Sequence, residues 1–331
     1  MRASILVPVY NSASTLVRCL ASALDQTVTD IEVLVADDAS TDNSAAIADR
    51  MAAGDARLRV MRMPINGGKP RAMNALMAQA RGDWVAVLDA DDAYHPSRLA
   101  RLIGAAEMHG TDMAADNLQY LDAGLPAAGG SGLGTVLRTA FDATAGDRVF
   151  GKAELVAGAD SFGEFDYGIL KPVIRRSFVE RHALAYFEYS RLAEDFTYLL
   201  DYVVAGGTCV VVSDPLYIWT MPFGTVSRRW TQTGAGAWHY DYRQALAANA
   251  HFSAVMQARG EAEVVEMLQR RGRQYTAMIH YIDAQKQAAT GAHAAAALTL
   301  ACHPSTWRLL ARRVSGRAMR AWTARRGPIA T

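Results

Sequence analysis

The stretch Trp84-Val-Ala-Val-Leu-Asp-Ala-Asp-Asp-Ala-Tyr94 (WVAVLDADDAY) places an apolar run directly before three carboxylates. The run is short and follows Gly82-Asp83, which is typical of a strand buried on both faces. Asp89, Asp91 and Asp92 then lie at its C-terminal end, the edge at which open α/β sheets bind ligands. Because like charges repel, we expect a positive group between these carboxylates.

Strand and helix patterns alternate along the first hundred residues. Strands are indicated at 3–9, 31–36, 57–61 and 84–88, and helices at 14–24, 42–51, 69–80 and 97–108. Strands that alternate with helices build a doubly wound, mostly parallel sheet. From about residue 232 the sequence becomes alanine-rich and helical. We therefore expect an α/β protein with a C-terminal helical region.

The charge of the chain is divided unevenly between its body and its tail. The formal net charge is +1. From Ala284 to Thr331, however, there are eight Lys or Arg and no Asp or Glu, which leaves 26 basic and 33 acidic residues in the rest. A basic segment attached to an acidic body predicts separate roles for the two parts.

Cysteine usage and hydropathy predict a cytoplasmic location. Cys19, Cys209 and Cys302 are far apart and lack the spacing of metal ligands, so a disulfide framework is not expected. The N-terminus lacks the apolar core of a signal peptide, because Pro8 and Asn11 interrupt it. No apolar run is long enough to cross a bilayer.

The aspartates after residue 88 allow several interpretations. They can form a solvated turn that caps a helix. As hard oxygen ligands they also suit Mg²⁺ or Mn²⁺, which binds phosphate oxygens as further ligands. A phosphatase of the haloacid dehalogenase type also has Asp-x-Asp after an apolar strand, but on its first strand. Neither Gly-x-Gly-x-x-Gly nor a Walker motif is present.

Four segments together resemble the family 2 glycosyltransferases of the GT-A fold. They are SILVPVYNSASTLVRCLASALDQT (4–27), IEVLVADDASTDNS (31–44), NGGKPRAMNALMAQARGDWVAVLDADD (66–92) and LAEDF (192–196). The resemblance, which extends to bacterial exopolysaccharide glucosyltransferases, implies a Rossmann-like sheet. It implies a nucleotide-sugar-binding half at 1–115, an acceptor-binding half at 116–230 and a helical region with a basic tail at 231–331.

The resemblance implies a donor site for a UDP-sugar. Pro8 and Tyr10 would line the pocket for the base, and Asp38 would accept the uracil N–H in a charge-assisted hydrogen bond. Lys69 or Arg71, at a helix start, would meet the diphosphate. The alternatives are that Asp38 caps a helix and that the two cations form a solvated turn.

The family pattern also implies the metal site and the base. Asp89 would reach the ribose or a metal-bound water, and Asp91 or Asp92 would bind Mn²⁺ or Mg²⁺; all three are candidate ligands. Glu194 and Asp195 match an acidic pair at the acceptor side. Asp195 is the expected general base, which takes the proton of the attacking acceptor hydroxyl. Direct displacement would invert the anomeric centre, and the metal would offset charge on the leaving diphosphate.

The acceptor end of the sequence is less specific. Gly168–Phe178 resembles a segment of exopolysaccharide transferases, and Lys171, Arg175 and Arg176 would meet a phosphate of a lipid-linked sugar or form a solvated surface. Thr225–Trp230 lacks the Gln of processive synthases, which favours the addition of a single hexose. Glucose is favoured by analogy alone. A non-catalytic protein of the same fold, binding a sugar nucleotide or glycan, is the alternative.

The basic tail predicts a partner surface. Between His303 and Gly327, apolar residues and arginines fall on different faces of a helix that contains Trp307. Such a helix is typical of binding to an anionic membrane surface, which would make the enzyme peripheral on the inner face of the plasma membrane. The alternatives are packing against the acidic body or a homodimer contact. Nucleic acid is not an expected partner.

Overall fold

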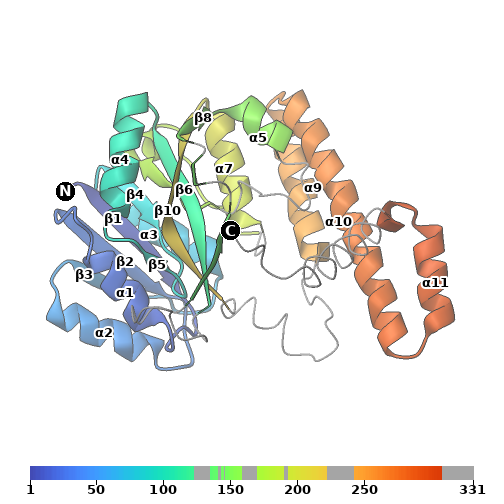
Figure 1. Ribbon diagram of the computed structural model, residues 1–331, viewed down its shortest axis with the longest axis horizontal. Coiled ribbons are helices and arrows are strands. Elements are labelled where there is room, and N and C mark those ends of the chain that lie inside the picture. The colour runs from blue at the N-terminus through green and yellow to red at the C-terminus, as the bar shows by residue number, and fades with distance from the viewer. Residues whose placement is uncertain are drawn as a thin grey trace, which may run out of the picture. The chain divides into compact units, whose positions relative to one another are not determined.

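The structure is a computed structural model of the 331-residue chain. It describes residues 1–122, 135–140, 143–144, 146–158, 170–189, 193–221 and 242–307. The chain divides into two compact units, Met1–Arg228 and Arg229–Thr331. The first is built around a β-sheet and the second from helices (Figure 1).

The first four long strands form the parallel core of the sheet. β1 (Ala3–Val9) lies between β2 (Ile31–Asp37) and β4 (Trp84–Val87), and β3 (Leu58–Arg62) pairs with the outer side of β2. β1 is almost entirely buried and β2 and β4 completely so, because apolar residues point to both faces. The structure therefore confirms the doubly wound, mostly parallel sheet.

The second half of the sheet continues from β4 in the order β9, β6, β10, β5. These strands are β9 (Val173–Arg175), β6 (Met113–Asp122), β10 (Cys209–Met221) and β5 (Ala93–Tyr94). β9 runs antiparallel to both of its neighbours, whereas β10 is parallel to β6. The short strands β7 (Thr135–Thr139) and β8 (Arg148–Phe150) pair with β6 and β10.

Helices connect and cover the strands of the first unit. They are α1 (Leu16–Leu24), α2 (Ser44–Gly54), α3 (Lys69–Gln79), α4 (Arg98–His109), α5 (Lys152–Gly158), α6 (Arg176–Arg181) and α7 (Glu194–Val204). α3 packs on β1 and β2, and α4 packs on β6 and β10. The predicted helices among these begin or end within three residues of the observed ones, as expected for helix boundaries.

A buried ion pair joins α4 to the second half of the sheet. Arg98 donates to both carboxylate oxygens of Asp116 at 2.9 and 2.7 Å, and neither side chain is exposed. The guanidinium also donates to the main-chain oxygen of Lys171 and lies over the ring of Tyr94, 4.2 Å from its centroid. This bidentate geometry offsets the cost of removing both charges from water.

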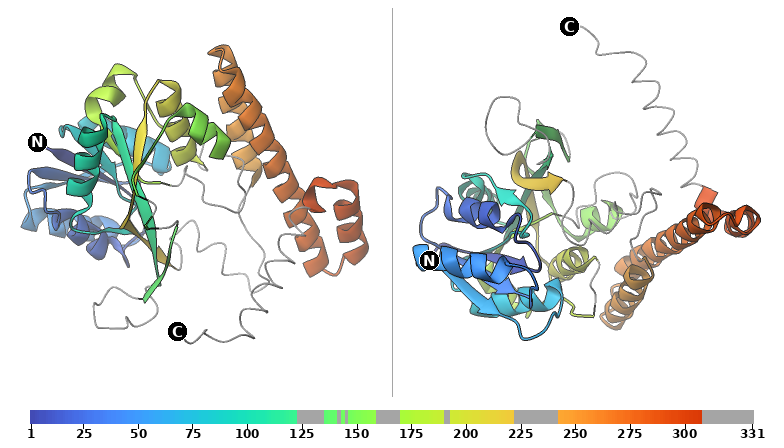
Figure 2. Two further views of the ribbon diagram at one scale, coloured as in Figure 1. Left: turned by 45° about the horizontal axis from the view of Figure 1, so that its top comes forward. Right: turned by 90° about the horizontal axis from the view of Figure 1, so that it is seen from below.

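Among its described residues, the second unit contains α9 (Tyr242–Ala258), α10 (Ala262–Ala289) and α11 (His293–Cys302). α9 and α11 both lie along α10 (Figure 2). In the described ranges, no helix has the length and apolarity needed to cross a membrane. Of the predicted amphipathic tail, everything after Trp307 lies outside the described residues.

Candidate functional site

The carboxyl ends of three parallel strands bring the predicted donor residues to one edge of the sheet. Tyr10 directly follows β1 and Asp38 directly follows β2, and Asp89 follows β4 with one residue between them. Because β1 pairs in parallel with both of the other strands, these ends lie side by side. This edge is where an open α/β sheet binds its ligand.

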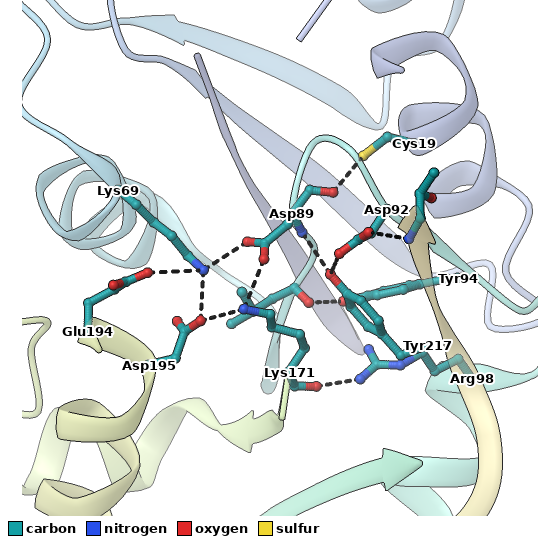
Figure 3. Close-up of polar contacts among 12 residues, drawn as sticks. Cys19, Lys69, Asp89, Asp92, Tyr94, Arg98, Lys171, Glu194, Asp195 and Tyr217 are labelled. Atoms are coloured by element: carbon teal, nitrogen blue, oxygen red, sulfur yellow. Dashed lines mark hydrogen bonds and ion pairs between the residues drawn. The ribbon is translucent and has the colours of Figure 1, made fainter. Parts of the chain in front are cut away.

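Asp89 lies between two lysine ammonium groups. Its Oδ1 is 2.9 Å from Nζ of Lys69, the first residue of α3, and its Oδ2 is 2.9 Å from Nζ of Lys171, which precedes β9 (Figure 3). The sequence predicts a positive group between the three aspartates, and the structure places two ammonium groups at the first of them, Asp89.

The same two lysines reach the acidic pair at the start of α7. Asp195 Oδ2 is 2.9 Å from Nζ of Lys69 and also accepts a hydrogen bond from Nζ of Lys171. Glu194 Oε1 is 3.6 Å from Nζ of Lys69. Three carboxylates and two ammonium groups thus form one cluster, in which Asp89 and Asp195 share both cations (Figure 3).

The cluster perturbs the protonation of its members. Burial acts to lower the pKa of the Lys69 ammonium, but Asp195, Asp89 and Glu194 outweigh it and hold that pKa well above its usual value. Burial would raise the pKa of Asp89, yet Lys171 and Lys69 hold it below its usual value. Burial and the neighbouring Asp195 raise the pKa of Glu194. Perturbed ionisable groups gathered at a sheet edge are typical of a functional site.

Ala193 positions the acidic pair with a strained backbone. It caps α7 with φ 59° and ψ 25°, in the left-handed region that non-glycine residues seldom occupy. Such strain persists only where the surrounding structure imposes it, and it is concentrated at functional sites.

Both carboxylate oxygens of Asp92 accept hydrogen bonds from the protein. Its Oδ2 accepts a hydrogen bond of 2.8 Å from the hydroxyl of Tyr217, and its Oδ1 accepts one of 2.9 Å from the backbone N–H of Thr220. The Tyr217 oxygen in turn accepts the backbone N–H of Asp89 at 3.2 Å. Burial and the charges of Asp91 and Asp89 raise the pKa of Asp92 well above its usual value. Asp92 therefore fixes the turn against β10.

Asp91 is the aspartate best placed to bind a metal ion. Its carboxylate has no side-chain partner in the described parts of the chain, and burial, together with Asp89, raises its pKa, so the group gains from a cation. The described parts of the chain contain no group of three or more His, Cys, Asp or Glu side chains that could hold a metal ion. Asp89 and Asp92, the other two candidate ligands, are both already paired within the protein. One carboxylate fits a Mg²⁺ or Mn²⁺ ion that takes its other ligands from phosphates and water.

Asp38 binds the loop that leads into α3. Its Oδ1 and Oδ2 accept the backbone N–H groups of Gly67 and Gly68, each at 2.8 Å. Gly68 has φ 84°, a conformation that favours glycine. A uracil N–H would have to share one of these oxygens. The observed contacts give Asp38 a structural role that the sequence does not indicate, since it positions the helix that begins at Lys69.

The remaining donor-side residues lie around this edge. Pro8 is half-buried in β1, and the side chain of Tyr10 is 36% exposed just beyond it. Arg71 is half-buried in the first turn of α3, two residues after Lys69. Pro8 and Tyr10 thus lie at the end of β1, and Arg71 lies in the first turn of the helix that begins at Lys69.

The three basic residues predicted for the acceptor do not lie together. Lys171 is buried in the cluster with Asp89 and Asp195. Arg175 lies opposite Trp84, at the start of β4, and pairs with Asp112 at 2.7 Å. This separation arises because β9 is antiparallel to β4, so each residue after Lys171 leads away from the site.

Arg176, the residue after Arg175, also lies away from the site and makes contacts within the fold. It donates to the main-chain oxygen of Gly82 at 2.8 Å and pairs with Glu180. Lys171, Arg175 and Arg176 therefore do not form one cluster in the structure.

Solved structures with the same fold define the class of protein. S. aureus TarS 1-349 in complex with UDP-GlcNAc superposes with a TM-score of 0.60 at 19% identity, over 82% of this chain and 72% of that chain. The mannosyltransferase PcManGT from Pyrobaculum calidifontis, in complex with GDP-Man and Mn²⁺, gives 0.54 at 17% identity, over 98% and 83%. The sheet is thus that of the GT-A glycosyltransferase fold.

Sequence similarity identifies the family within that class. Residues 4–127 match the family described as Glycosyl transferase family 2. The succinoglycan biosynthesis protein ExoO of Rhizobium meliloti (strain 1021) is 34% identical over 235 residues, which are 67% of this chain and 62% of ExoO. The chain thus spans less than two thirds of the length of that relative. Residues 4–127 therefore form a family 2 glycosyltransferase domain.

Proposed function

We propose that the protein transfers one hexose, with glucose favoured, from a UDP-sugar to a saccharide acceptor in the synthesis of an exopolysaccharide. The acceptor is a lipid-linked oligosaccharide at the inner face of the plasma membrane. The similarity to ExoO, a succinoglycan biosynthesis protein, supports the exopolysaccharide part of this proposal. The TarS complex with UDP-GlcNAc supports a UDP-sugar as the donor.

The position of Asp195 carries the proposal. α7 begins at the acidic pair and brings Asp195 to the sheet edge at which Asp89 lies, and both carboxylates contact the same two lysines. A protein that only binds a sugar nucleotide has no need of a second carboxylate at this point. A transferase needs one as general base.

The proposed reaction is a single displacement. The acceptor hydroxyl oxygen forms a bond to the anomeric carbon while the bond from that carbon to the phosphate oxygen breaks, and UDP leaves with the electron pair. Asp195 takes the hydroxyl proton. An attack from the face opposite the nucleotide converts an α-linked donor into a β-glycoside.

The chain offers two groups for the charge of the diphosphate. Lys69 stands at the N-terminus of α3, where both its ammonium group and the helix end favour an anion. Asp91 would hold Mn²⁺ or Mg²⁺, and that ion, when bound, offsets the negative charge that develops on the leaving diphosphate.

Nucleotide binding tests the donor side of the proposal. We expect UDP to bind in a calorimetric titration with Mn²⁺ more tightly than GDP or dTDP, and to bind weakly in EDTA. Release of UDP from individual UDP-hexoses in the presence of a lipid extract then identifies the sugar. If none of the three nucleotides binds with metal, the donor site is misassigned.

Substitution of Asp195 tests the catalytic side. Asp195→Asn keeps the shape of the side chain and removes the base, so turnover should fall by about 10²-fold or more while UDP still binds. Asp112→Asn is a matched control, because Asp112 is a half-buried carboxylate that pairs with Arg175 at the opposite edge of the sheet. Unchanged turnover in Asp195→Asn would remove the base from the proposal. Phosphate release that depends on Asp89, without sugar transfer, would favour a phosphatase.

The basic tail is proposed as the membrane contact. Its arginines attract anionic headgroups at about 1 kcal/mol per residue near the surface. The intact chain should cosediment with vesicles that contain phosphatidylglycerol and not with phosphatidylcholine vesicles, and a chain that ends at Cys302 should lose this binding. Equal sedimentation of both chains would point to another role, such as a homodimer contact.

A further inference from the structure

Lys171 differs from Lys69 in how firmly the protein holds it. The side chain of Lys171 is 7% exposed and that of Lys69 is 21% exposed. The main-chain oxygen of Lys171 accepts a hydrogen bond from Arg98, whose guanidinium is fixed by Asp116 in the core. Lys69 begins a helix and faces the donor edge of the sheet. The two ammonium groups are therefore not equivalent.

The contacts of Lys171 join the two halves of the site. Its ammonium is 2.9 Å from Oδ2 of Asp89 and also contacts Oδ2 of Asp195, so it spans the donor-side and acceptor-side carboxylates (Figure 3). Lys171 lies just before β9, and β9 lies between the two halves of the sheet because it pairs with β4 on one side and with β6 on the other.

A ligand can replace the carboxylate partners of Lys69 more easily than those of Lys171. A diphosphate that approaches from solvent meets Lys69 first, and that ammonium can exchange its carboxylates for phosphate oxygens. If Lys171 turned away, the partly buried carboxylates of Asp89 and Asp195 would lose a counter-ion, which is costly. Burial acts to lower the pKa of Lys171, but Asp195 and Asp89 raise it above its usual value, so the ammonium stays charged.

We propose that Lys171 is a positioning residue, which holds Asp195 in place as the base while Lys69 turns to the diphosphate of the donor. This inference rests on the proposed function, because it assigns Lys171 to the same transfer step. Lys171 itself touches neither the sugar nor the phosphates. Its effect on turnover is transmitted through the carboxylate of Asp195.

The test separates binding from turnover in two lysine variants and one control. UDP affinity is measured by calorimetry with Mn²⁺, and turnover by release of UDP from UDP-glucose with the lipid extract. Lys69→Met should weaken UDP binding about tenfold or more through the loss of a charge-assisted contact. Lys171→Met should bind UDP within about threefold of the wild type and lower kcat at least about tenfold.

Two further variants make the test specific. Arg59→Met removes a cation that pairs at 3.2 Å with the buried Glu32, far from this edge of the sheet, and should change neither quantity. In an Asp195→Asn background, Lys171→Met should lower the residual rate by less than about threefold, because residues that act as a unit are not additive. If Lys171→Met fails to fold, Lys171→Arg serves instead, since it keeps the charge and alters the contact geometry.

The outcomes distinguish this inference from the proposed function. Equal loss of UDP affinity in the two lysine variants would make Lys171 a donor ligand and overturn the inference. Full kcat in a folded Lys171 variant would also overturn it, while transfer that depends on Asp195 would still stand. If the wild type releases no UDP from UDP-glucose, the assigned donor fails, and the affinity comparison still decides whether Lys171 is a donor ligand.

Discussion

Asp38 holds the backbone N–H of Gly68 at 2.8 Å through Oδ2, and its other oxygen holds the N–H of Gly67. The end of β2 is thereby joined to the N-terminus of α3. Because α3 begins at Lys69, this contact sets the position of the ammonium group in the charge cluster. A residue that resemblance assigns to the nucleotide base thus also builds the side of the site on which Lys69 lies.

Asp38→Asn should destabilise the protein. An amide has one acceptor oxygen where the carboxylate has two, so one of the two part-buried N–H groups loses its partner. The free energy of unfolding, measured in urea, should fall by about 1.5–3 kcal/mol, and UDP affinity should fall with it. Asp49→Asn, which breaks the exposed ion pair with Arg62, should change stability by less than about 1 kcal/mol. Equal stability of the two variants would contradict the assignment.

Tyr217→Phe should loosen the aspartate turn. The variant leaves Asp92 and the N–H of Asp89 without the hydroxyl that connects them. We expect a loss of about 1–3 kcal/mol in the free energy of unfolding together with a lower kcat. Tyr202→Phe is the matched control, since it removes a hydroxyl that donates to Thr208 outside the site. A normal kcat in Tyr217→Phe would show that the turn needs no such support.

Asp91→Asn should abolish the metal dependence of nucleotide binding. With Mn²⁺ present, the variant should bind UDP about tenfold more weakly than the wild type or worse. In EDTA the two proteins should bind UDP equally. Asp92→Asn should keep the Mn²⁺ effect, because the protein itself uses that carboxylate. Loss of the Mn²⁺ effect in Asp92→Asn alone would assign the ion to the other aspartate.

His280 should make the helical unit sensitive to acid. Burial and the stacked ring of His303, 3.4 Å away between centroids, lower the pKa of His280, with a smaller effect of Arg243, and Asp283 opposes them. A histidine whose pKa is lowered on folding takes up its proton first in the unfolded chain. Stability should therefore be complete above the unfolded pKa of about 6.5 and fall as the pH drops below it.

Thermal unfolding at pH 8 and pH 5.5 checks whether stability falls as the pH drops. His280→Gln should show a smaller drop in the unfolding midpoint of the helical unit between the two pH values than the wild type shows. An equal drop in both proteins would assign the acid sensitivity to other groups.

Local patterns were enough to predict the four parallel strands in the first half of the sheet. The apolar runs at 3–9 and 84–88 are buried strands, and their alternation with helices indicated that they run parallel. The edge at which Asp38, Asp89 and Lys69 meet follows from the same rule, because parallel strands end together. The role of Asp195 was predicted only from resemblance to the family, because a single acidic pair has no sequence pattern that indicates a catalytic base.

The remaining contacts depend on tertiary structure that no local pattern encodes. Lys171 belongs to the cluster because β9 enters antiparallel between two parallel strands, and nothing in its three residues indicates that direction. Tyr217 reaches Asp92 from a strand 125 positions away. Arg98 looks like an exposed helix residue until its partner Asp116 is placed beside it in the core.

The cluster has a consequence for how the chain folds. Lys69 and Asp195 are separated by 126 positions, so their contact closes a large loop of chain and belongs to the slow, non-local part of folding. During synthesis the whole segment 4–127 emerges before Lys171 and Asp195 exist, and Asp89 then has Lys69 as its one counter-ion from the cluster. The active arrangement is thus among the last to be acquired, and refolded protein should regain its helical circular dichroism before it regains turnover.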